Sequence, residues 1–262
     1  MNSASSNVHV EIDDSRAAGP VARVTIDNER RLNCMTSAQT CRLEAAFKNL
    51  SKDETLRAIV LTGAGNRAFI GGADLNELGK FDREGVRTFI TAMHHACKAI
   101  RDCPVPVIGR INGFTLGAGL EIAASCDMRV ATDTAVLGMP EVKMGIPSVI
   151  EAALLPGLIG WGKTRELLLT GDNISAQEAL RIGLVERVVA AEQLDAAVED
   201  WLSGILASAP LAVRTQKALI DRWQRSSLEE GVLAGIDAIA DAYPTGEPTL
   251  RIAGFFAHKA KK

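Results

Sequence analysis

Two glutamates in the stretch from residue 112 to 147, NGFTLGAGLEIAASCDMRVATDTAVLGMPEVKMGIP, have the type and spacing for acid/base chemistry. Glu121 falls in the first turn of a short apolar helix that follows a glycine-rich turn, and Glu141 comes directly after Met139-Pro140. Side chains that follow separate turns can approach one point from different walls, which proton transfer at a small centre requires. Simpler explanations are that Glu121 stabilises its helix dipole and that Glu141 is a solvated corner residue.

The glycine-rich turn itself, GFTLGAGLE, predicts an anion site of a particular kind. It matches neither the dinucleotide fingerprint GxGxxG nor the P-loop, because no GK[ST] follows, so phosphate binding explains it poorly. A helix start near Gly117-Ala118 instead leaves free N–H groups with partial positive charge, which can hold an oxyanion.

A second glycine turn, Gly71-Gly72, precedes Ala73 and Asp74. The glycines permit backbone geometry closed to other residues, and Asp74 can cap a helix that begins near Leu75. One interpretation is that the N–H of Ala73 points into a site. The other is an ordinary turn between a strand and a helix.

The elements that must position these residues alternate between strand and helix, which favours parallel strands and βαβ crossovers. Strands are predicted at 21–27, 57–62, 105–111 and 184–189; helices are predicted from a cap at Thr36 or Ser37 to Leu50, and at 87–103, 152–159, 164–170, 176–182, 190–208, 211–225 and 228–242. The helical carboxy-terminal third has more apolar surface than one small core absorbs. We therefore expect it to pack on the α/β part and on a neighbouring subunit.

Composition excludes several classes of protein. A chain of 262 residues can bury a large core without disulfide bonds to stabilise it. With a net charge of −3, the protein has no broad basic surface for binding nucleic acid. Five cysteines without CxxC spacing favour free thiols in a reducing compartment, and the adjacent His94 and His95 make a poor metal pair. The amino terminus lacks a secretory signal and no apolar run reaches about 18 residues, so we predict a cytoplasmic protein with no membrane partner.

Taken together, three motifs make the chain closely resemble the enoyl-CoA hydratase/isomerase (crotonase) superfamily. They are RAFIGGADLNEL, PVIGRINGFTLGAGLEIAASCDMRVAT and AVLGMPEVKMGIP, and the likeness runs from about residue 9 to 260. The resemblance implies an α/β fold: a crotonase-like spiral of ββα units over residues 9–195, after a disordered tail at 1–8. It also implies a helical region at 196–262 used for trimerisation, in a homotrimer or a dimer of trimers.

The resemblance implies a role for each candidate catalytic residue. The N–H groups of Ala73 and Ala118 match the pair that grips the thioester carbonyl oxygen, although the family more often has glycine where Ala118 stands. Glu121 matches the base that activates water for attack at Cβ, and Glu141 matches the acid that protonates Cα. Family members that isomerise, cleave or dehalogenate commonly lack one of the two glutamates, so the pair favours a hydratase.

The substrate implied is an acyl-CoA thioester, with no cofactor because CoA is part of the substrate. Its CoA half would follow the backbone around residues 68–75 and the turn after the first strand, and Lys259 would reach a neighbour's CoA. The candidate binding residues are Arg30, Arg31, Ala68, Gly72, Asp74, Leu75, Gly117 and Lys259. The two arginines and Lys259 can equally be solvated charges.

One departure from the family concerns residues 148–155. Most hydratases resemble GAGGTQRL after the GIP sequence, whereas this chain has SVIEAALL, which adds a third carboxylate, Glu151. We expect Glu151 to face solvent in a first helical turn; contact with a polar acyl group and participation in proton transfer are the alternatives. For the whole protein, the alternatives are a 3-enoyl/2-enoyl-CoA isomerase, a Clp-type peptidase, for which no suitable histidine is evident, and a non-catalytic CoA or RNA binder.

Overall fold

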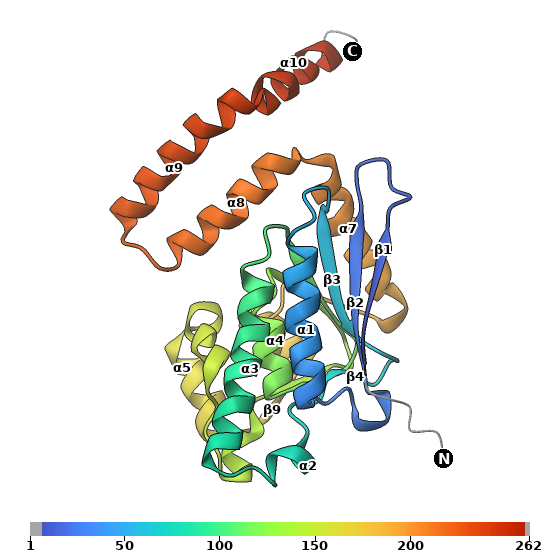
Figure 1. The fold of residues 1–262 in the computed structure, drawn as a ribbon, viewed down its shortest axis with the longest axis vertical. Coiled ribbons are helices and arrows are strands. Elements are labelled where there is room, and N and C mark those ends of the chain that lie inside the picture. The colour runs from blue at the N-terminus through green and yellow to red at the C-terminus, as the bar shows by residue number, and fades with distance from the viewer. Residues whose placement is uncertain (1–6, 260–262) are drawn as a thin grey trace.

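The computed structural model describes residues 7–259, in which two β-sheets are covered by helices and a helical arm extends from one end (Figure 1). The larger sheet has the strand order β1-β2-β3-β5-β7-β10. These strands are β1 Asn7–Asp13, β2 Val21–Asp27, β3 Ala58–Gly63, β5 Val107–Ile111, β7 Met128–Thr132 and β10 Arg187–Val189. β1 and β2 are antiparallel and the other neighbours are parallel, as the alternation of strands and helices predicts.

The smaller sheet has the order β4-β6-β8-β9. Its strands are β4 Ala68–Ile70, β6 Phe114–Leu116, β8 Val136–Gly138 and β9 Asn173–Ser175. From β3 to β8, consecutive strands alternate between the two sheets, and a helix follows each pair: α3 (Arg83–Arg101), α4 (Ala118–Ala124) and α5 (Leu155–Thr170). The expected spiral of ββα units is therefore confirmed.

The remaining helices of the body agree with the predicted positions to within a few residues. They are α1 Ser37–Leu50, α2 Leu75–Leu78 and α6 Ala176–Arg181. The body also contains four short 3-10 helices: η1 Glu29–Arg31 and η2 Pro140–Met144, which were not predicted, and η3 Ile150–Leu154 and η4 Ala191–Gln193, which overlap the helices predicted at 152–159 and 190–208. Thr36 caps α1 by accepting a hydrogen bond from the Gln39 N–H in a capping box. The helix predicted at 152–159 spans the end of η3 and the start of α5, and the helix predicted at 164–170 is the end of α5, which breaks at Gly160 (φ 71°, ψ 162°).

The first strand, β1, was not predicted. Asn7 and Val8 belong to β1 and pair with Asp27 and Ile26 of β2, so the segment 1–8 is not wholly a disordered tail; residues 1–6 lie outside the described part of the chain. β1 is an edge strand with mostly exposed side chains, so its position depends on backbone pairing to β2. A hydrophobic pattern therefore could not reveal where it starts.

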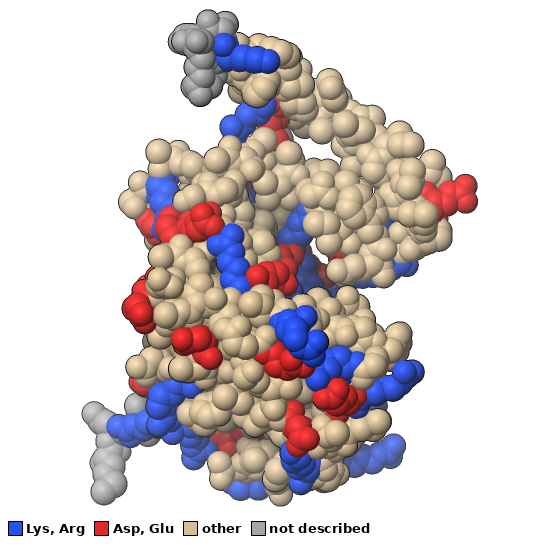
Figure 2. All heavy atoms as spheres, turned by 180° about the vertical axis from the view of Figure 1, so that it is seen from behind, with Lys and Arg blue, Asp and Glu red and all other residues tan. Residues whose placement is uncertain are grey.

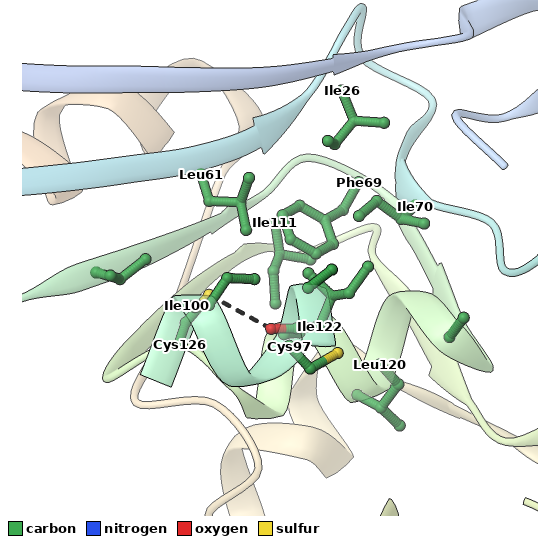
Figure 3. Close-up of a cluster of buried hydrophobic side chains, with 14 of the residues drawn as sticks. Ile26, Leu61, Phe69, Ile70, Cys97, Ile100, Ile111, Leu120, Ile122 and Cys126 are labelled. Atoms are coloured by element: carbon green, nitrogen blue, oxygen red, sulfur yellow. Dashed lines mark hydrogen bonds between the residues drawn. The ribbon is translucent and has the colours of Figure 1, made fainter. Parts of the chain in front are cut away.

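The main core lies between the sheets and helices α1, α3 and α4 (Figure 3). Ile122 of α4 lies beside Phe69 and Ile111 from the strands, and Leu120 of the same helix belongs to the same core cluster. All seven residues of α4 are buried, including Glu121. The helix is thus fixed on every side, and its amino-terminal end has a rigid position.

The carboxy-terminal helices divide into one that packs in the body and three that form an arm, the first of which is tied to the body by hydrogen bonds from Arg214 to the Leu56 carbonyl and from Lys217 to Asp127. α7 (Leu194–Ala207) packs on the larger sheet through Leu194, Val198 and Leu202, so the boundary predicted at 195/196 falls inside a helix of the body. α8 (Pro210–Trp223), α9 (Leu228–Ala242) and α10 (Glu247–Lys259), the last of which the sequence analysis missed, form the arm.

The arm exposes much apolar surface. Large side chains that are more than half exposed on α9 and α10 are Leu228, Val232, Leu233, Ile236, Ile239, Leu250, Phe255 and Phe256. On the face shown in Figure 2, acidic and basic residues are interspersed over the body, while the arm is mostly uncharged. Within residues 7–259 no single helix is long and apolar enough to cross a membrane; one pair, Ala191–Ala207 with Pro210–Trp223, meets the length and composition requirement only together and is bent by 110°.

Candidate active site

One cavity of about 950 Å³ lies where the turns after β4, β6 and β8 meet. Its polar wall contains Ala73, Ala118, Glu121 and Glu141, four residues that the sequence analysis selected as catalytic candidates. Gly72, Leu75 and Gly117 also line it. The topology brings these turns together because β4, β6 and β8 are neighbouring strands of the smaller sheet, and β4 and β6 run parallel to β8.

The amino-terminal end of α4 is held in place by Gly117. Its N–H donates to the Gly138 carbonyl oxygen at 2.9 Å, and its backbone (φ 53°, ψ −122°) is one that only glycine adopts readily. A Cβ at this position would lie 2.4 Å from Oε1 of Glu141. Glycine is therefore required both by the turn and by the close approach of the Glu141 carboxylate to the backbone.

The two backbone N–H groups selected from the sequence are free to bind a ligand. Met35 forms a bridge with the 72–74 turn, in which its N–H donates to the Gly72 carbonyl and its carbonyl accepts from the Asp74 N–H, both at 2.8 Å. This leaves the Ala73 N–H between them. Among the described residues, neither this N–H nor that of Ala118 has a hydrogen-bond partner, and both residues line the cavity.

Glu121 is buried, with 5% of its surface exposed. Oε1 accepts a hydrogen bond from the Ala152 N–H at 3.3 Å. Burial raises the pKa of Glu121 to about 8, and the nearby Glu141 carboxylate contributes in the same direction. A glutamate that merely stabilised its helix dipole would gain from ionisation, whereas this one favours the protonated form near neutral pH.

Glu141 reaches the same cavity from a different element, η2. Pro140 starts η2, and Gly145 ends it with a left-handed conformation (φ 77°). The Glu141 side chain is partly buried, and its Oε2 accepts a hydrogen bond from the Ser148 hydroxyl at 2.9 Å. The carboxylate therefore lies in the cavity wall and not at a solvated corner.

A separate shallow hollow of about 610 Å³ contains the arginines that follow β2. It is lined by Arg30, Arg31, Leu32, Arg67 and Phe114. Arg67 was missed by the sequence analysis, although it begins the motif RAFIGGADLNEL, and only the spiral fold brings it beside residues 30 and 31. Arg31 donates from Nη1 to Asp74 at 2.6 Å, so one side of its guanidinium is already engaged.

Three other candidates do not line the cavity. Asp74 is buried and accepts hydrogen bonds from Arg31 and from the backbone and side chain of Asn76, so it caps α2 and orients the turn. Ala68 is buried in β4, where its carbonyl accepts from Asn33. Lys259 is exposed at the end of α10 and lines neither hollow within this chain.

The expectation that Glu151 faces solvent is wrong. Only 3% of its surface is exposed, and its Oε1 accepts hydrogen bonds from Arg101 Nη2 at 2.7 Å and His94 Nδ1 at 2.9 Å. The error has a physical cause: residues 150–154 form a 3-10 helix that packs against α3 and α4, so the first turn is covered. Sequence spacing cannot reveal which neighbouring helix covers a turn.

An apolar wall completes the cavity and, apart from Leu75, was also missed. It consists of Leu75, Leu78, Phe81, Val86, Ile90, Leu116, Met144, Ile146 and Val149. These residues come from α2, the loop that joins it to α3, α3 itself, β6 and the 144–149 segment, with Asp82, Arg83 and Arg87 also among the lining residues. The amphipathic pattern of α3 was recognised, but its predicted start at 87 excluded the first turn, which contributes Arg83 and Val86.

The arrangement can carry out acid/base chemistry next to a stabilised oxyanion. Two carboxylates from different elements and two free N–H groups share one cavity, where they can act on neighbouring atoms of a bound molecule. Among the described residues, no cluster of three or more His, Cys, Asp or Glu side chains could hold a metal ion. Besides the carboxylates and the peptide N–H groups, Arg83 and Arg87 line the cavity.

Many known proteins are similar to this chain in sequence and in fold. The enoyl-CoA hydratase/isomerase family model matches residues 16–243. The short-chain-enoyl-CoA hydratase of Clostridium acetobutylicum is 34% identical over 87% of each chain, and the crotonyl-CoA hydratase of Syntrophomonas wolfei is 32% identical over 86% of this chain and 87% of the relative. The crystal structure of an enoyl-CoA hydratase from Bacillus anthracis superposes with a TM-score of 0.88 at 32% identity, covering 97% of this chain and 96% of that one. Since the family match spans most of the residues and includes the whole cavity, this chain belongs to the enoyl-CoA hydratase/isomerase family.

Proposed function

We propose that this protein is a hydro-lyase that adds water reversibly to the double bond of a 2-trans-enoyl-CoA to give 3-hydroxyacyl-CoA. One observation carries the proposal: Glu121, Glu141 and the free N–H groups of Ala73 and Ala118 line the same cavity. The hydratase names of relatives that share about a third of their residues with this chain support it.

The two N–H groups bind the thioester carbonyl oxygen of the substrate. Attack of water at Cβ moves negative charge onto this oxygen, and two fixed donors stabilise the enolate that forms. Loss of one such donor typically costs roughly 3 kcal/mol of barrier. The methyl group of Ala118 does not alter this role, because the donor is the peptide group.

The reaction needs one proton on the two carboxylates, on Glu141 at the start of hydration and on Glu121 at the start of dehydration. Glu121 takes a proton from water as that water attacks Cβ, and Glu141 gives its proton to Cα, so one proton enters the pair as another leaves. Dehydration follows the same path with the proton initially on Glu121. The high pKa of Glu121 agrees with a pair that retains its single proton up to about pH 8.

The acyl chain lies along the apolar wall, and the CoA phosphates lie at the hollow lined by Arg30, Arg31 and Arg67. Arginine matches phosphate oxygens in charge and geometry. No cofactor is needed, since CoA arrives with the substrate. The exposed apolar arm supports a homotrimer or a dimer of trimers, in which Lys259 approaches a neighbour's CoA. Light scattering should then give three or six times the chain mass of 27.9 kDa.

The proposal is tested with a panel of enoyl-CoA thioesters of increasing length, beginning with crotonyl-CoA. Product analysis should find 3-hydroxyacyl-CoA and the reverse dehydration. Glu141→Gln should remove nearly all turnover without altering the fold, while Glu166→Gln, an exposed carboxylate on α5, should not. Full activity of Glu141→Gln, or double-bond migration without a hydroxyacyl product, would overturn the proposal in favour of an isomerase.

A further inference from the structure

One short segment contacts both carboxylates of the cavity. Ser148 donates its hydroxyl proton to Glu141 at 2.9 Å, and the Ala152 N–H donates to Glu121 at 3.3 Å. These two residues are only four positions apart in the chain. The conformation of the 148–152 segment therefore fixes the orientation of both carboxylates together.

This segment contains a strained residue. Ile150 has φ 37°, in a region that β-branched residues rarely adopt. Such a conformation persists only when the surrounding structure holds it in place. The next residue, Glu151, provides a hold of this kind.

Glu151 anchors the segment to α3. Its Oε1 accepts from Arg101 Nη2 at 2.7 Å and from His94 Nδ1 at 2.9 Å, and a carboxylate acceptor requires that His94 Nδ1 carries the proton. Both donors lie on the same helix, and Glu151 itself is 3% exposed. Release of this contact would free η3 from α3 at the point beside Ile150.

The anchor is not optimised for stability alone. Among the described residues, Oε2 of Glu151 and Nε of Arg101 are buried without hydrogen-bond partners. A partly satisfied buried ion pair is often no more stabilising than apolar side chains of the same size. Its presence beside Glu121 therefore indicates a contribution to the site.

The titratable groups around Glu121 come from three elements of the surrounding structure. They are Glu141 on η2, Glu151 on η3, and Cys97 and Arg101 on α3. Burial raises the pKa of the Cys97 thiol well above its ordinary value, so this group stays neutral. Glu141 and Glu151 are thus the charges that raise the pKa of Glu121, while Arg101 is paired with Glu151.

We propose that Glu151 is a positioning residue for this centre: anchored to α3 by Arg101 and His94, it holds the 148–152 segment in the conformation that orients Glu121 and Glu141. This inference rests on the proposed function, because it assigns the two carboxylates their roles. It also gives a reason for the departure from the sequence typical of hydratases after residue 147. The added carboxylate takes over the support of a segment that lacks the family's glycines.

The test compares Glu151→Gln and Glu151→Ala with the wild type in steady-state hydration of crotonyl-CoA between pH 5 and 10. Glutamine keeps the size of the side chain and an oxygen for Arg101 and His94, but it removes a negative charge that raises the pKa of Glu121. The pair then loses its proton at lower pH. We expect the alkaline limb of kcat/KM to move down by roughly 0.5 to 1 pH unit.

Alanine removes the anchor as well as the charge. We expect kcat to fall roughly 10- to 100-fold, as is typical of misplaced catalytic groups, with KM changed less than about 3-fold because Val149 is the one residue of the apolar wall that lies in the freed segment and the arginine hollow is not altered. The matched control is Glu186→Gln, which also takes a carboxylate from a buried arginine, Arg129, but lies outside the cavity.

Three results would overturn the inference: a Glu151→Gln limb that coincides with that of the wild type, an equal shift in Glu186→Gln, or a folded Glu151→Ala enzyme with wild-type kcat. If Glu151→Ala does not fold, the limb of Glu151→Gln decides alone. Failure of the proposed function is separate, since Glu121→Gln would then be as active as the wild type.

Discussion

The substitution Gly117→Ala tests whether catalysis depends on the position of the Glu141 carboxylate. An added Cβ would lie 2.4 Å from Oε1 of Glu141, and ordinary contacts begin at about 3.4 Å. The Glu141 oxygen must therefore withdraw by about 1 Å, and it can do so because it ends a flexible side chain. A displacement of this size typically costs about 10²-fold in rate. The backbone at φ 53° and ψ −122° adds strain of roughly 1–3 kcal/mol.

The assay is crotonyl-CoA hydration at saturating substrate, together with thermal unfolding. Gly117→Ala should lower kcat about 100-fold with little change in KM, because the apolar wall and the arginine hollow are not touched, and it should lower Tm by several degrees. Gly204→Ala on α7, where an added Cβ meets nothing within 4 Å, is the matched control. Wild-type kcat in folded Gly117→Ala would refute the reasoning that the Glu141 carboxylate must lie against this backbone.

Three further predictions follow from the same geometry. Turnover in either direction should fall above about pH 8 as the Glu121 and Glu141 pair loses its proton, and a rate that stays constant to pH 10 would contradict this. The folded-state pKa of Glu121 is raised from 4.5 to about 8, so its stabilising contribution is present in full below pH 4.5 and is lost as the pH rises through 8. Glu121→Gln should therefore have a higher Tm than the wild type at pH 9 and a similar Tm at pH 4. An equal difference in Tm at both pH values would disprove the effect. Arg67→Ala should raise KM for crotonyl-CoA roughly 3- to 10-fold but leave KM for crotonyl-pantetheine unchanged, and equal effects on both thioesters would rule out a phosphate contact.

Local patterns determined much of the fold and the chemical groups of the site. β2 and α9 have the predicted bounds, because the order of apolar and polar side chains along the chain has the period of a strand in β2 and of a helix in α9. The start of α4 and the proline turn before Glu141 were also predictable, because glycine and proline restrict or permit backbone angles locally. The edge strand β1 and the helix α10 were not, since their exposed side chains give no core pattern.

Contacts between distant segments decided the rest. The sequence alone supplied two glutamates, two glycine turns and, through motif resemblance, a family. The tertiary structure joined the turns in one cavity, buried Glu151 against Arg101 and placed Arg67 beside Arg30. The reason is physical: backbone preferences act over a few neighbouring residues, whereas burial and the pKa of a carboxylate depend on which other elements pack against it.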